Sequence, residues 1–470
     1  LTIYYKMASV IPHRLVLEEE KLPLPCIFQR RKFDSSEGTV TGGTTAKMFI
    51  PSGRNQFLNC KNSWLNFSFT ANLTGTNLPT AADNTTNLLI DPMGVSQCIK
   101  KLTVKNNNVT IYELDHYAKA VAMLTVANST TTTQNVRNLT NSMAASSSID
   151  KQYNTLSGLS VETKGPFVYG ADNTSVTTPL ISCSIPLLGL MGNTNMPLTE
   201  IEHGIQIDIE FERDVNQVFY CGNRVIADTS TLTGGTLNFS EINYEGAITT
   251  LDDSTMKEVE KDNGFKRGAV MWSDNYHILH NKTFSAAQLG VEQDISLIVP
   301  SLRYTSLNAI YHAAFQMASP SEKALYPLGV PHIAVDKIRY NIGGILYPRN
   351  YVDSKSKMLQ NTQVCNTNVD ISNAVGLMSN ENTTLNYRPP VDTYPAAALT
   401  TTDRGVVGIN FETFPDIDSI AGLDSTYVDC EAQIGLKGVS ANSQNLDFWF
   451  LGVMDCVYIL EDGELRRSFN

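Results

Sequence analysis

A ten-residue segment of this chain occurs twice. Residues 50–59 read IPSGRNQFLN and residues 299–308 read VPSLRYTSLN. Proline, serine, arginine, leucine and asparagine occupy the same places in both copies, which lie about half the chain apart. Self-similarity at half the length of a chain indicates one domain built twice. The 470 residues also exceed what one hydrophobic core usually serves, which favours two domains.

The local patterns are those of β-strands. Short β-branched and aromatic runs bounded by Gly, Asn, Asp and Pro recur along the chain, and helical periodicity is scarce. Residues 64–69 and 205–211 alternate between apolar and polar side chains, as strands with one buried face do. Charged residues make up only 17%, which suits a hydrogen-bonding surface with long polar loops. We therefore predict an all-β chain.

A second correspondence links the two halves. Residues 101–111 align with residues 337–347, and each segment predicts a two-stranded hairpin. The turn centres are Asn107-Asn108 and Gly343-Gly344, which are residue types that tolerate a positive φ.

Each hairpin is followed by a long polar loop and then by three candidate strands. The loops span residues 127–158 and about 361–404, and loops of this length are usually functional or disordered. The candidate strands are 180–188, 204–211 and 237–249 in the first half, and 406–413, 427–436 and 448–460 in the second.

About eight short strands per half with one long crossing loop is typical of a jelly roll, in which two four-stranded sheets pack face to face. β-Sandwiches of another topology remain an alternative, because periodicity does not reveal strand order. The predicted fold is two tandem eight-stranded jelly-roll β-sandwiches with long inter-strand loops. The predicted domains are an N-terminal arm (1–25), a first jelly roll (26–252), a linker helix (253–265) partly capped by Ser254, and a second jelly roll (266–470).

Charge and cysteine content limit the possible partners and the redox environment of the chain. The net charge of −12 argues against wrapping nucleic acid, so no sequence-specific nucleic-acid partner is predicted. The basic cluster Arg30-Arg31-Lys32 is either a solvated terminal arm or a contact to a neighbour or an acidic interior. Met7-Ala8-Ser9 looks like a natural start, which predicts that the native protein begins there. The eight cysteines form no CxxC pair and predict buried free thiols in a reducing compartment.

Two histidine-containing segments have the residue types of reactive sites. His277 and His280 have ligand-like i, i+3 spacing, but no companion set completes a metal site, so structural histidines are favoured. Asp115-His116-Tyr117 suggests a proton relay, but without a nucleophile motif it is better interpreted as the hydrogen-bonded end of the hairpin.

Acidic and aromatic residues also indicate no clear metal-binding or sugar-binding site. Asp416, Asp418 and Asp424 are spaced loosely like calcium ligands, yet the loop lacks the EF-hand pattern. The tryptophans lie in apolar strand contexts, which favours core packing over sugar stacking. They are Trp64, Trp272 and Trp449. No catalytic, cofactor-binding or metal-binding residue is predicted, and no cofactor.

Four segments together suggest a family: residues 38–69 (GTVTGGTTAKMFIPSGRNQFLNCKNSWLNFSF), 99–117 (IKKLTVKNNNVTIYELDHY), 186–211 (PLLGLMGNTNMPLTEIEHGIQIDIEF) and 335–350 (VDKIRYNIGGILYPRN). In their sequence, order and spacing they resemble the double jelly-roll major capsid proteins of icosahedral DNA viruses, the lineage of adenovirus hexons, virophages, Polinton-like viruses and nucleocytoplasmic large DNA viruses. Many large-virus members carry a Ser-Gly-x-x-Asn turn before a late strand, where this chain has Ser-Ile-Ala-Gly-Leu-Asp-Ser at residues 419–425. The resemblance therefore favours the smaller, virophage-like or Polinton-like members.

The resemblance implies a structural, non-enzymatic capsid subunit. Three copies would form a pseudohexagonal homotrimer, and these capsomers would tile an icosahedral shell. Its implied partners are itself, neighbouring capsomers, and penton and minor capsid proteins, with an internal membrane left open. The implied location is the virion, after synthesis in the host cytoplasm or nucleus.

Two other function classes remain open. A tandem β-sandwich lectin, adhesin or viral spike would need aromatic residues in its loops, and the long loops contain few. A glycosidase on a sandwich scaffold would need two carboxylates facing each other across a cleft, and no pair stands out among the many acidic residues.

Overall fold

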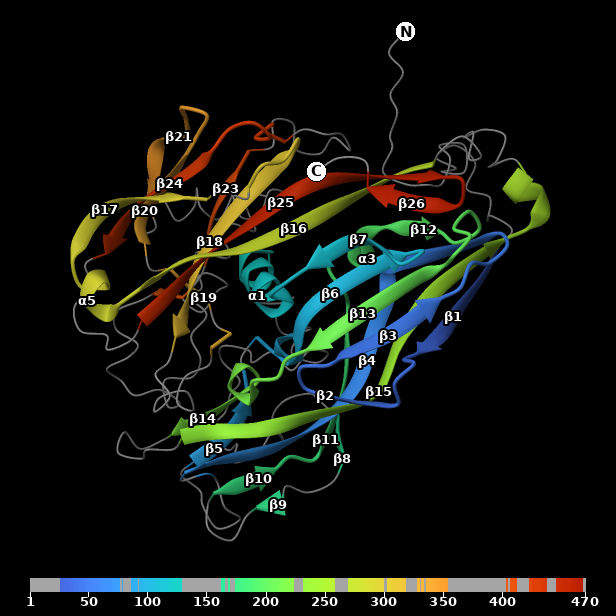
Figure 1. Ribbon diagram of the computed structural model, residues 1–470, viewed down its shortest axis with the longest axis horizontal. Coiled ribbons are helices and arrows are strands. Elements are labelled where there is room, and N and C mark those ends of the chain that lie inside the picture. The colour runs from blue at the N-terminus through green and yellow to red at the C-terminus, as the bar shows by residue number, and fades with distance from the viewer. Residues whose placement is uncertain are drawn as a thin grey trace, which may run out of the picture.

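A computed structural model gives the fold of the chain (Figure 1). The structure describes residues 26–76, 78, 86–91, 93–128, 162–164, 168–169, 174–223, 231–257, 269–299, 302–317, 328–329, 331–333, 335–353, 403–404, 406–411, 422–437 and 445–467. The predicted arm (1–25) lies outside these residues, as does most of each predicted long loop (129–158 and 361–402).

The first half of the chain builds two packed sheets. One has the strand order β1-β15-β4-β11 and the other β3-β13-β6-β7. All neighbours in both sheets are antiparallel. The strands are β1 (Cys26–Asp34), β3 (Thr45–Ile50), β4 (Gln56–Thr76), β6 (Ile99–Asn106), β7 (Val109–Leu114), β11 (Leu180–Ile185), β13 (Ile205–Phe211) and β15 (Thr231–Leu251).

The second half repeats this arrangement. Its sheets have the orders β16-β25-β18-β23 and β17-β24-β20-β21, again antiparallel throughout. The strands are β16 (Ala269–Phe284), β17 (Glu292–Ile298), β18 (Leu307–Met317), β20 (Val335–Ile342), β21 (Ile345–Asp353), β23 (Val407–Asn410), β24 (Cys430–Lys437) and β25 (Asn445–Glu461).

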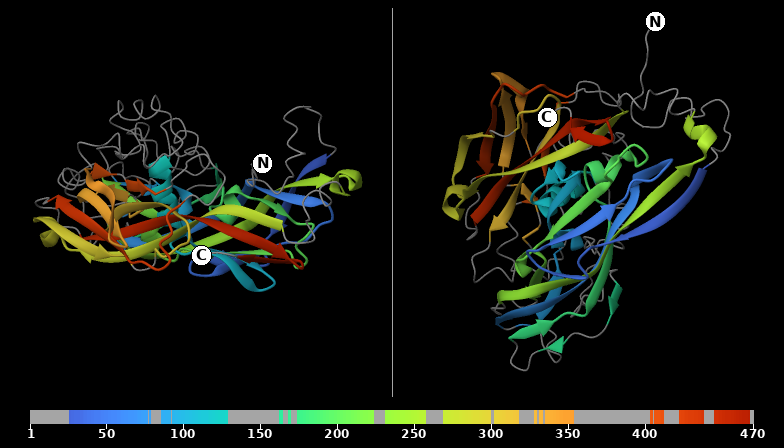
Figure 2. Two further views of the ribbon diagram at one scale, coloured as in Figure 1. Left: turned by 90° about the horizontal axis from the view of Figure 1, so that it is seen from above. Right: turned by 45° about the vertical axis from the view of Figure 1, so that its right-hand side comes forward.

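The pairing scheme identifies the topology. Numbered in chain order within each half, strand one pairs with eight, two with seven, three with six and four with five. A long hairpin rolled into two sheets produces this scheme, which is the jelly roll. The predicted double jelly roll is therefore confirmed, and the alternative of another sandwich topology is wrong. Figure 2 shows the two jelly rolls side by side.

Shorter elements decorate this scaffold. The additional strands are β2 (Thr39–Thr41), β5 (Thr86–Ile90), β8 (Glu162–Lys164), β9 (Val168–Tyr169), β10 (Ser175–Thr177), β12 (Asn195–Pro197), β14 (Phe219–Asn223), β19 (Pro331–Ile333), β22 (Asp403–Arg404) and β26 (Glu464–Arg467). The helices are η2 (Val95–Cys98), α1 (Tyr117–Asn128), α3 (Leu190–Asn193), η4 (Val215–Gln217) and α5 (Ala286–Leu289). None of the helices in the described ranges is long and apolar enough to cross a membrane.

The repeated decamers occupy equivalent places. Each spans the connection between the second and third strands of its jelly roll, β3 to β4 and β17 to β18, and so crosses from one sheet to the other. The leucine that each copy contributes to the third strand, Leu58 or Leu307, is fully buried. The repeat is thus a sheet-crossing segment that anchors the start of the third strand.

The two predicted hairpins are β6–β7 and β20–β21. Asn107 and Asn108 have φ of 48° and 63°, and Gly343 and Gly344 have φ of 59° and 87°. Two consecutive positive φ values are required by the tight turn whose twist matches the flanking strands. Asparagine and glycine both tolerate this backbone conformation, so the predicted equivalence of the two hairpins is confirmed.

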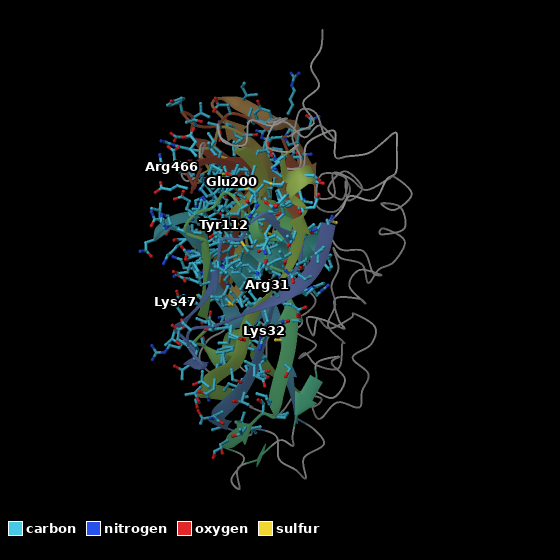
Figure 3. The ribbon with its side chains drawn as sticks, turned by 90° about the vertical axis from the view of Figure 1, so that its right-hand side faces the viewer. Arg31, Lys32, Lys47, Tyr112, Glu200 and Arg466 are labelled. Atoms are coloured by element: carbon cyan, nitrogen blue, oxygen red, sulfur yellow. The ribbon has the colours of Figure 1, made fainter. Side chains whose placement is uncertain are left out.

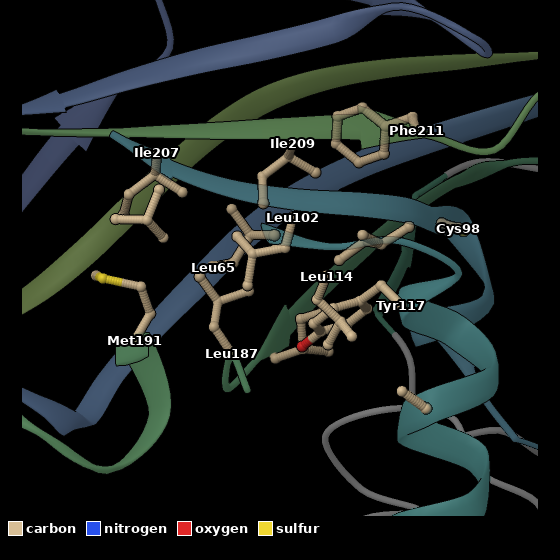
Figure 4. Close-up of a cluster of buried hydrophobic side chains, with 14 of the residues drawn as sticks. Leu65, Cys98, Leu102, Leu114, Tyr117, Leu187, Met191, Ile207, Ile209 and Phe211 are labelled. Carbon is tan, nitrogen blue, oxygen red and sulfur yellow. The ribbon is translucent and has the colours of Figure 1, made fainter. Parts of the chain in front are cut away.

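The first core forms between the two sheets of the first jelly roll. In β13, Ile207 and Ile209 point inward and Asp208 belongs to the outer face, as the alternating sequence predicts. The ring of Phe211 stacks on that of Phe239, with centroids 4.0 Å apart, and Phe67 packs against both. Figure 4 shows Ile207, Ile209 and Phe211 on one side of this cluster. Each fully buried side chain of this size contributes roughly 1.5–3 kcal/mol.

The two jelly rolls share a buried seam. In β25, Phe448 and Phe450 point into the second core, whereas Trp449 and Leu451 belong to the cluster that is continuous with the first core. Sheet β16-β25-β18 is therefore apolar on both faces, which explains the unbroken apolar run in residues 448–454. Helix α1 packs against β16 and β18 at this seam (Figure 1).

Two local expectations need correction. The hairpin ends at Leu114, and a turn at Asp115 and His116 leads into α1, a helix that the sequence did not predict. The start of the linker is helical over residues 253–257, but its cap is Asp252, not Ser254. The Asp252 carboxylate accepts hydrogen bonds from the backbone N–H groups of Ser254 and Thr255. Hydrogen bonds from the side chains of Ser254 and Thr255, followed by these backbone bonds, lower its pKa. Residues 258–265 of the predicted linker lie outside the described residues.

Candidate assembly surfaces

His277 and His280 do not form a shared site. They lie on β16 at i and i+3, and an odd spacing places side chains on opposite faces of a strand. His277 Nδ1 lies against the Tyr304 hydroxyl, whereas His280 Nε2 is 3.5 Å from Asp447. Among the residues the structure describes, no group of three or more His, Cys, Asp or Glu side chains is placed to hold a metal ion.

The candidate calcium ligands and the candidate proton relay do not form sites either. Asp424 is exposed and accepts hydrogen bonds from the backbone N–H and hydroxyl of Thr426, which lowers its pKa. Asp416 and Asp418 lie outside the described residues. Asp115 pairs with Lys101 at 3.2 Å, on the hairpin surface rather than with His116. These contacts suit turn and strand surfaces.

The tryptophans differ in role. Trp449 is 5% exposed and lies in the seam, so its predicted core packing is confirmed. Trp64 is only half-buried, because it alternates with the inward-facing Leu65, and the core prediction is wrong for it. The side chain of Trp272 lies outside the described set.

The repeated arginines are equivalent in position but not in partner. Arg54 Nη2 is 3.1 and 3.0 Å from the two carboxylate oxygens of Asp253 in the linker. Arg303 pairs with Asp429, which directly precedes β24. Both pairs are largely exposed, so each contributes at most about 1 kcal/mol to stability.

The seam holds a lysine within a cluster of aromatic and histidine rings that the sequence did not indicate. Lys119 of α1 places its Nζ 4.6 Å from the ring centroid of Phe315 and 5.1 Å from that of Trp449. The rings of His116 and His280 lie 4.8 and 5.0 Å from the Trp449 ring. Burial lowers the pKa of Lys119, and burial followed by the charge of Lys119 lowers that of His116. A cation–π contact therefore links the two jelly rolls.

Further contacts fix one jelly roll on the other. The backbone N–H of Leu465 donates to Asn106 Oδ1 at 3.0 Å, and that of Glu202 donates to the carbonyl of Gly463 at 3.0 Å. Gly329 N–H donates to Asp91 Oδ2 at 2.8 Å. These bonds join the second half to the first at three separate points, so the chain presents its jelly rolls as one body.

The outer faces of the β3-β13-β6-β7 and β17-β24-β20-β21 sheets are polar and internally paired. In the first, Lys105 Nζ is 2.6 Å from Asp208 and Lys101 Nζ is 2.7 Å from Glu113. In the second, Lys337 Nζ is 2.9 Å from Asp294. Such cross-strand pairs each contribute up to about 1 kcal/mol. The two faces thus carry charge without a large net field.

Exposed apolar side chains recur at equivalent positions of these sheets. The registers align Phe49, Gln206 and Lys105 in one row, and Ile298, Glu431 and Asn341 in the matching row of the second jelly roll. Phe49 is 54% exposed and Ile298 is 66% exposed. Two further apolar residues, Val109 and Ile345, are exposed directly after the equivalent turns. The two jelly rolls therefore share these exposed apolar positions.

The basic cluster lies in a strand. Arg30, Arg31 and Lys32 belong to β1, which pairs with β15, so the terminal-arm interpretation is wrong. Arg30 pairs with Glu245 at 3.1 Å and Lys32 with Asp34 at 2.8 Å. Figure 3 shows Arg31 and Lys32 near each other on this strand, with Lys47 farther out.

The described cysteines are free thiols, as predicted, and most are buried. Burial raises the pKa of Cys60 to about 12 and also raises those of Cys98 and Cys456. Thiols held in the protonated form are poor nucleophiles, so these cysteines act as apolar core residues.

Comparison with known proteins gave matches in structure but not in sequence. No family model matches the chain, and no curated protein matches it by sequence. A chain in the 3.5 Å cryo-EM structure of the Sputnik virophage is 9% identical, with a TM-score of 0.58, over 100% of this chain and 94% of that one. The mavirus major capsid protein is 10% identical, with a TM-score of 0.54, over 94% of this chain and 90% of that one. The faustovirus major capsid protein is 9% identical, with a TM-score of 0.54, over 94% of this chain and 92% of that one. Over nearly its whole length, this chain has the fold of the double jelly-roll major capsid proteins.

Proposed function

We propose that this chain is a structural major capsid protein, without enzymatic activity, that forms a homotrimeric pseudohexagonal capsomer in an icosahedral viral shell. The observation that carries the proposal is the whole-chain match to viral capsid structures together with two jelly rolls of identical strand order. Three chains would supply six similar wedges, and a closed ring of wedges hides their mutual faces.

The paired apolar residues support the same assembly. A contact used once by each jelly roll would occur at six similar places in a trimer. Phe49 and Ile298 satisfy that requirement, because they hold matching rows on the outer faces of matching sheets. The polar surroundings of both residues suit a surface that must stay soluble before assembly.

The proposal also covers the domains, the partners and the location of the chain. The domains are an arm (1–25), a first jelly roll (26–252), a linker helix (253–265) and a second jelly roll (266–470). The partners are other copies of the chain, then neighbouring capsomers, penton and minor capsid proteins, and the location is the virion. The internally paired polar side chains on the outer faces give a lectin no support.

The first test is the mass of the purified protein. Light scattering should give three times the mass of the chain, and electron microscopy should show particles with hexagonal outlines. A stable monomer at every concentration, with no such particles, would contradict the proposal.

Surface variants locate the contact. Replacing Phe49 and Ile298 together by serine should weaken the trimer at least about tenfold in its dissociation midpoint, because exposed apolar area is removed at every equivalent contact. The control is Tyr427→Ser, since Tyr427 is 93% exposed and lies outside the paired rows. Equal effects of the control and the double variant would remove Phe49 and Ile298 from the interface.

A further inference from the structure

The seam between the jelly rolls contains a half-open cavity of about 300 Å³. Five parts of the chain line it: β7 from the first jelly roll, and β16, the second decamer, β25 and β26 from the second. Its volume is at the lower end of the range for small-molecule sites. The lining residues are Tyr112, Glu113, Asn275, Tyr276, His277, Arg303, Tyr304, Met454 and Arg467.

Arg467 is the unusual member of this lining. Its Nε donates to Cys456 Sγ at 3.0 Å and its Nη2 to Met454 Sδ at 3.8 Å. Both sulfur atoms are weak and neutral acceptors. The Met454 thioether does not ionise, and burial raises the pKa of the Cys456 thiol. Within the described ranges, no carboxylate pairs with Arg467. A guanidinium has five N–H donors in a planar fork, so most of the Arg467 donors remain available.

The other charged groups around the cavity are already paired or neutral. Glu113, the only carboxylate in the lining, is held by Lys101 at 2.7 Å. Arg303 pairs with Asp429, which is not part of the lining. Burial, followed by the positive charge of Arg467, lowers the pKa of His277, so its ring is neutral at neutral pH. The lining as a whole therefore carries a net positive charge.

A buried polar group also lacks a partner here. The hydroxyl of Tyr112 is buried and has no hydrogen-bond partner among the described residues. This hydroxyl has almost no accessible surface and lies against Gly189, which does not line the cavity, so Tyr112 contributes its ring to the cavity wall. The Tyr304 hydroxyl is already in contact with His277 Nδ1. The cavity thus offers arginine donors among tyrosine side chains.

We propose that this seam cavity binds a small oxyanion, a phosphate or carboxylate group, through Arg467 and Arg303. Arginine forks match the geometry of both anions and form charge-assisted hydrogen bonds with them. Because the lining comes from both jelly rolls, a bound anion stabilises the docked pair over separated halves. Arg54, the counterpart of Arg303 in the first decamer, is held by both carboxylate oxygens of Asp253, and it is not among the residues that line this cavity.

The test is anion binding by the full-length protein at fixed ionic strength. Inorganic phosphate and succinate, each balanced against chloride, are titrated by calorimetry and by thermal unfolding. At least one should bind saturably and raise the unfolding temperature, and the arm with the larger effect identifies the chemistry. Phosphorus NMR line broadening reports phosphate binding directly. If neither anion does more than chloride, the proposal fails.

Matched variants assign the site. Arg467→Gln should weaken binding at least tenfold, and Arg303→Gln should weaken it by a smaller factor because that guanidinium is shared with Asp429. Arg466→Gln is the control, since Arg466 is the preceding residue of β26 and is paired with Glu464 at 2.8 Å. It should bind like the unmodified chain. Equal affinities in Arg467→Gln and Arg466→Gln would overturn the assignment, and circular dichroism establishes that each variant is folded. Binding does not depend on trimer formation, so the two proposals fail separately.

Discussion

Replacing Trp449 by alanine should lower the free energy of unfolding by about 3–5 kcal/mol, the usual loss when a large buried aromatic is truncated. The Trp449 side chain is 5% exposed and lies where α1 of the first jelly roll meets β25 of the second. Its removal takes apolar area out of the seam and leaves a cavity that strands on both sides keep open.

The position of Trp449 gives this variant a second consequence. The Lys119 ammonium makes cation–π contacts with two rings, those of Trp449 and Phe315. Without the indole, the partly desolvated Lys119 ammonium at the seam loses one of its two cation–π partners. The loss therefore weakens the docking of the jelly rolls as well as the packing of one sheet. Denaturant unfolding should change from one transition to two, since the halves no longer stabilise each other fully.

The control is Trp64→Ala. Trp64 lies on β4, is half-buried and faces away from the core, so the same change in chemistry should cost about 1 kcal/mol and leave a single transition. Urea unfolding followed by circular dichroism and limited proteolysis measures both effects. Similar losses in the two variants would show that Trp449 does not couple the jelly rolls.

The parts of the fold that the sequence predicted depend on local backbone chemistry. The turns at residues 107–108 and 343–344 need positive φ, and only a few residue types supply it. The alternating strands, such as residues 205–211, expose their two faces to different environments and so carry a readable period. Because these signals recur in the same order, the duplication and the jelly-roll class could be inferred without any three-dimensional information.

The parts that were missed depend on long-range packing. Helix α1 is apolar on nearly all sides, because it lies between the two jelly rolls, and it therefore lacks the amphipathic period that marks a surface helix. The seam itself brings Lys119 to Trp449 from positions more than 300 residues apart in the chain. The cavity around Arg467 likewise needs both jelly rolls in place. No spacing within either half could have indicated these contacts.

The unfolding free energy of the protein should also fall as the pH is lowered from about 6.5 to about 4, and His312 should account for the largest share. His312 is fully buried in the second core, between the rings of Phe448 and Phe450. Its Nδ1 is 3.0 Å from the carbonyl oxygen of Trp449 and donates to it, and its Nε2 has no partner in the described residues. Burial lowers the pKa of His312 from its ordinary value of 6.5 to about 4.

The direction of the effect follows from proton linkage. Between pH 6.5 and 4 the unfolded chain binds a proton at His312 and the folded chain does not, so stability rises with pH in this window. The stabilisation is complete above pH 6.5 and is lost as the pH falls towards 4. At about 1.4 kcal/mol for each pH unit between the two pKa values, the loss is about 3 kcal/mol. His116 and His277, whose pKa values burial also lowers, add to it in the same direction.

The variant His312→Asn isolates this contribution. Its side-chain amide can still donate to the Trp449 carbonyl but does not titrate, so the variant should be less stable at pH 7.5 and clearly less sensitive to acid. The control is His203→Asn, since His203 is exposed, and it should keep the full pH dependence. Urea unfolding from pH 4.5 to 7.5 measures the slopes. If His312→Asn kept the slope of the unmodified chain, the acid sensitivity would belong to the seam, where His116 lies beside Trp449, and not to the second core.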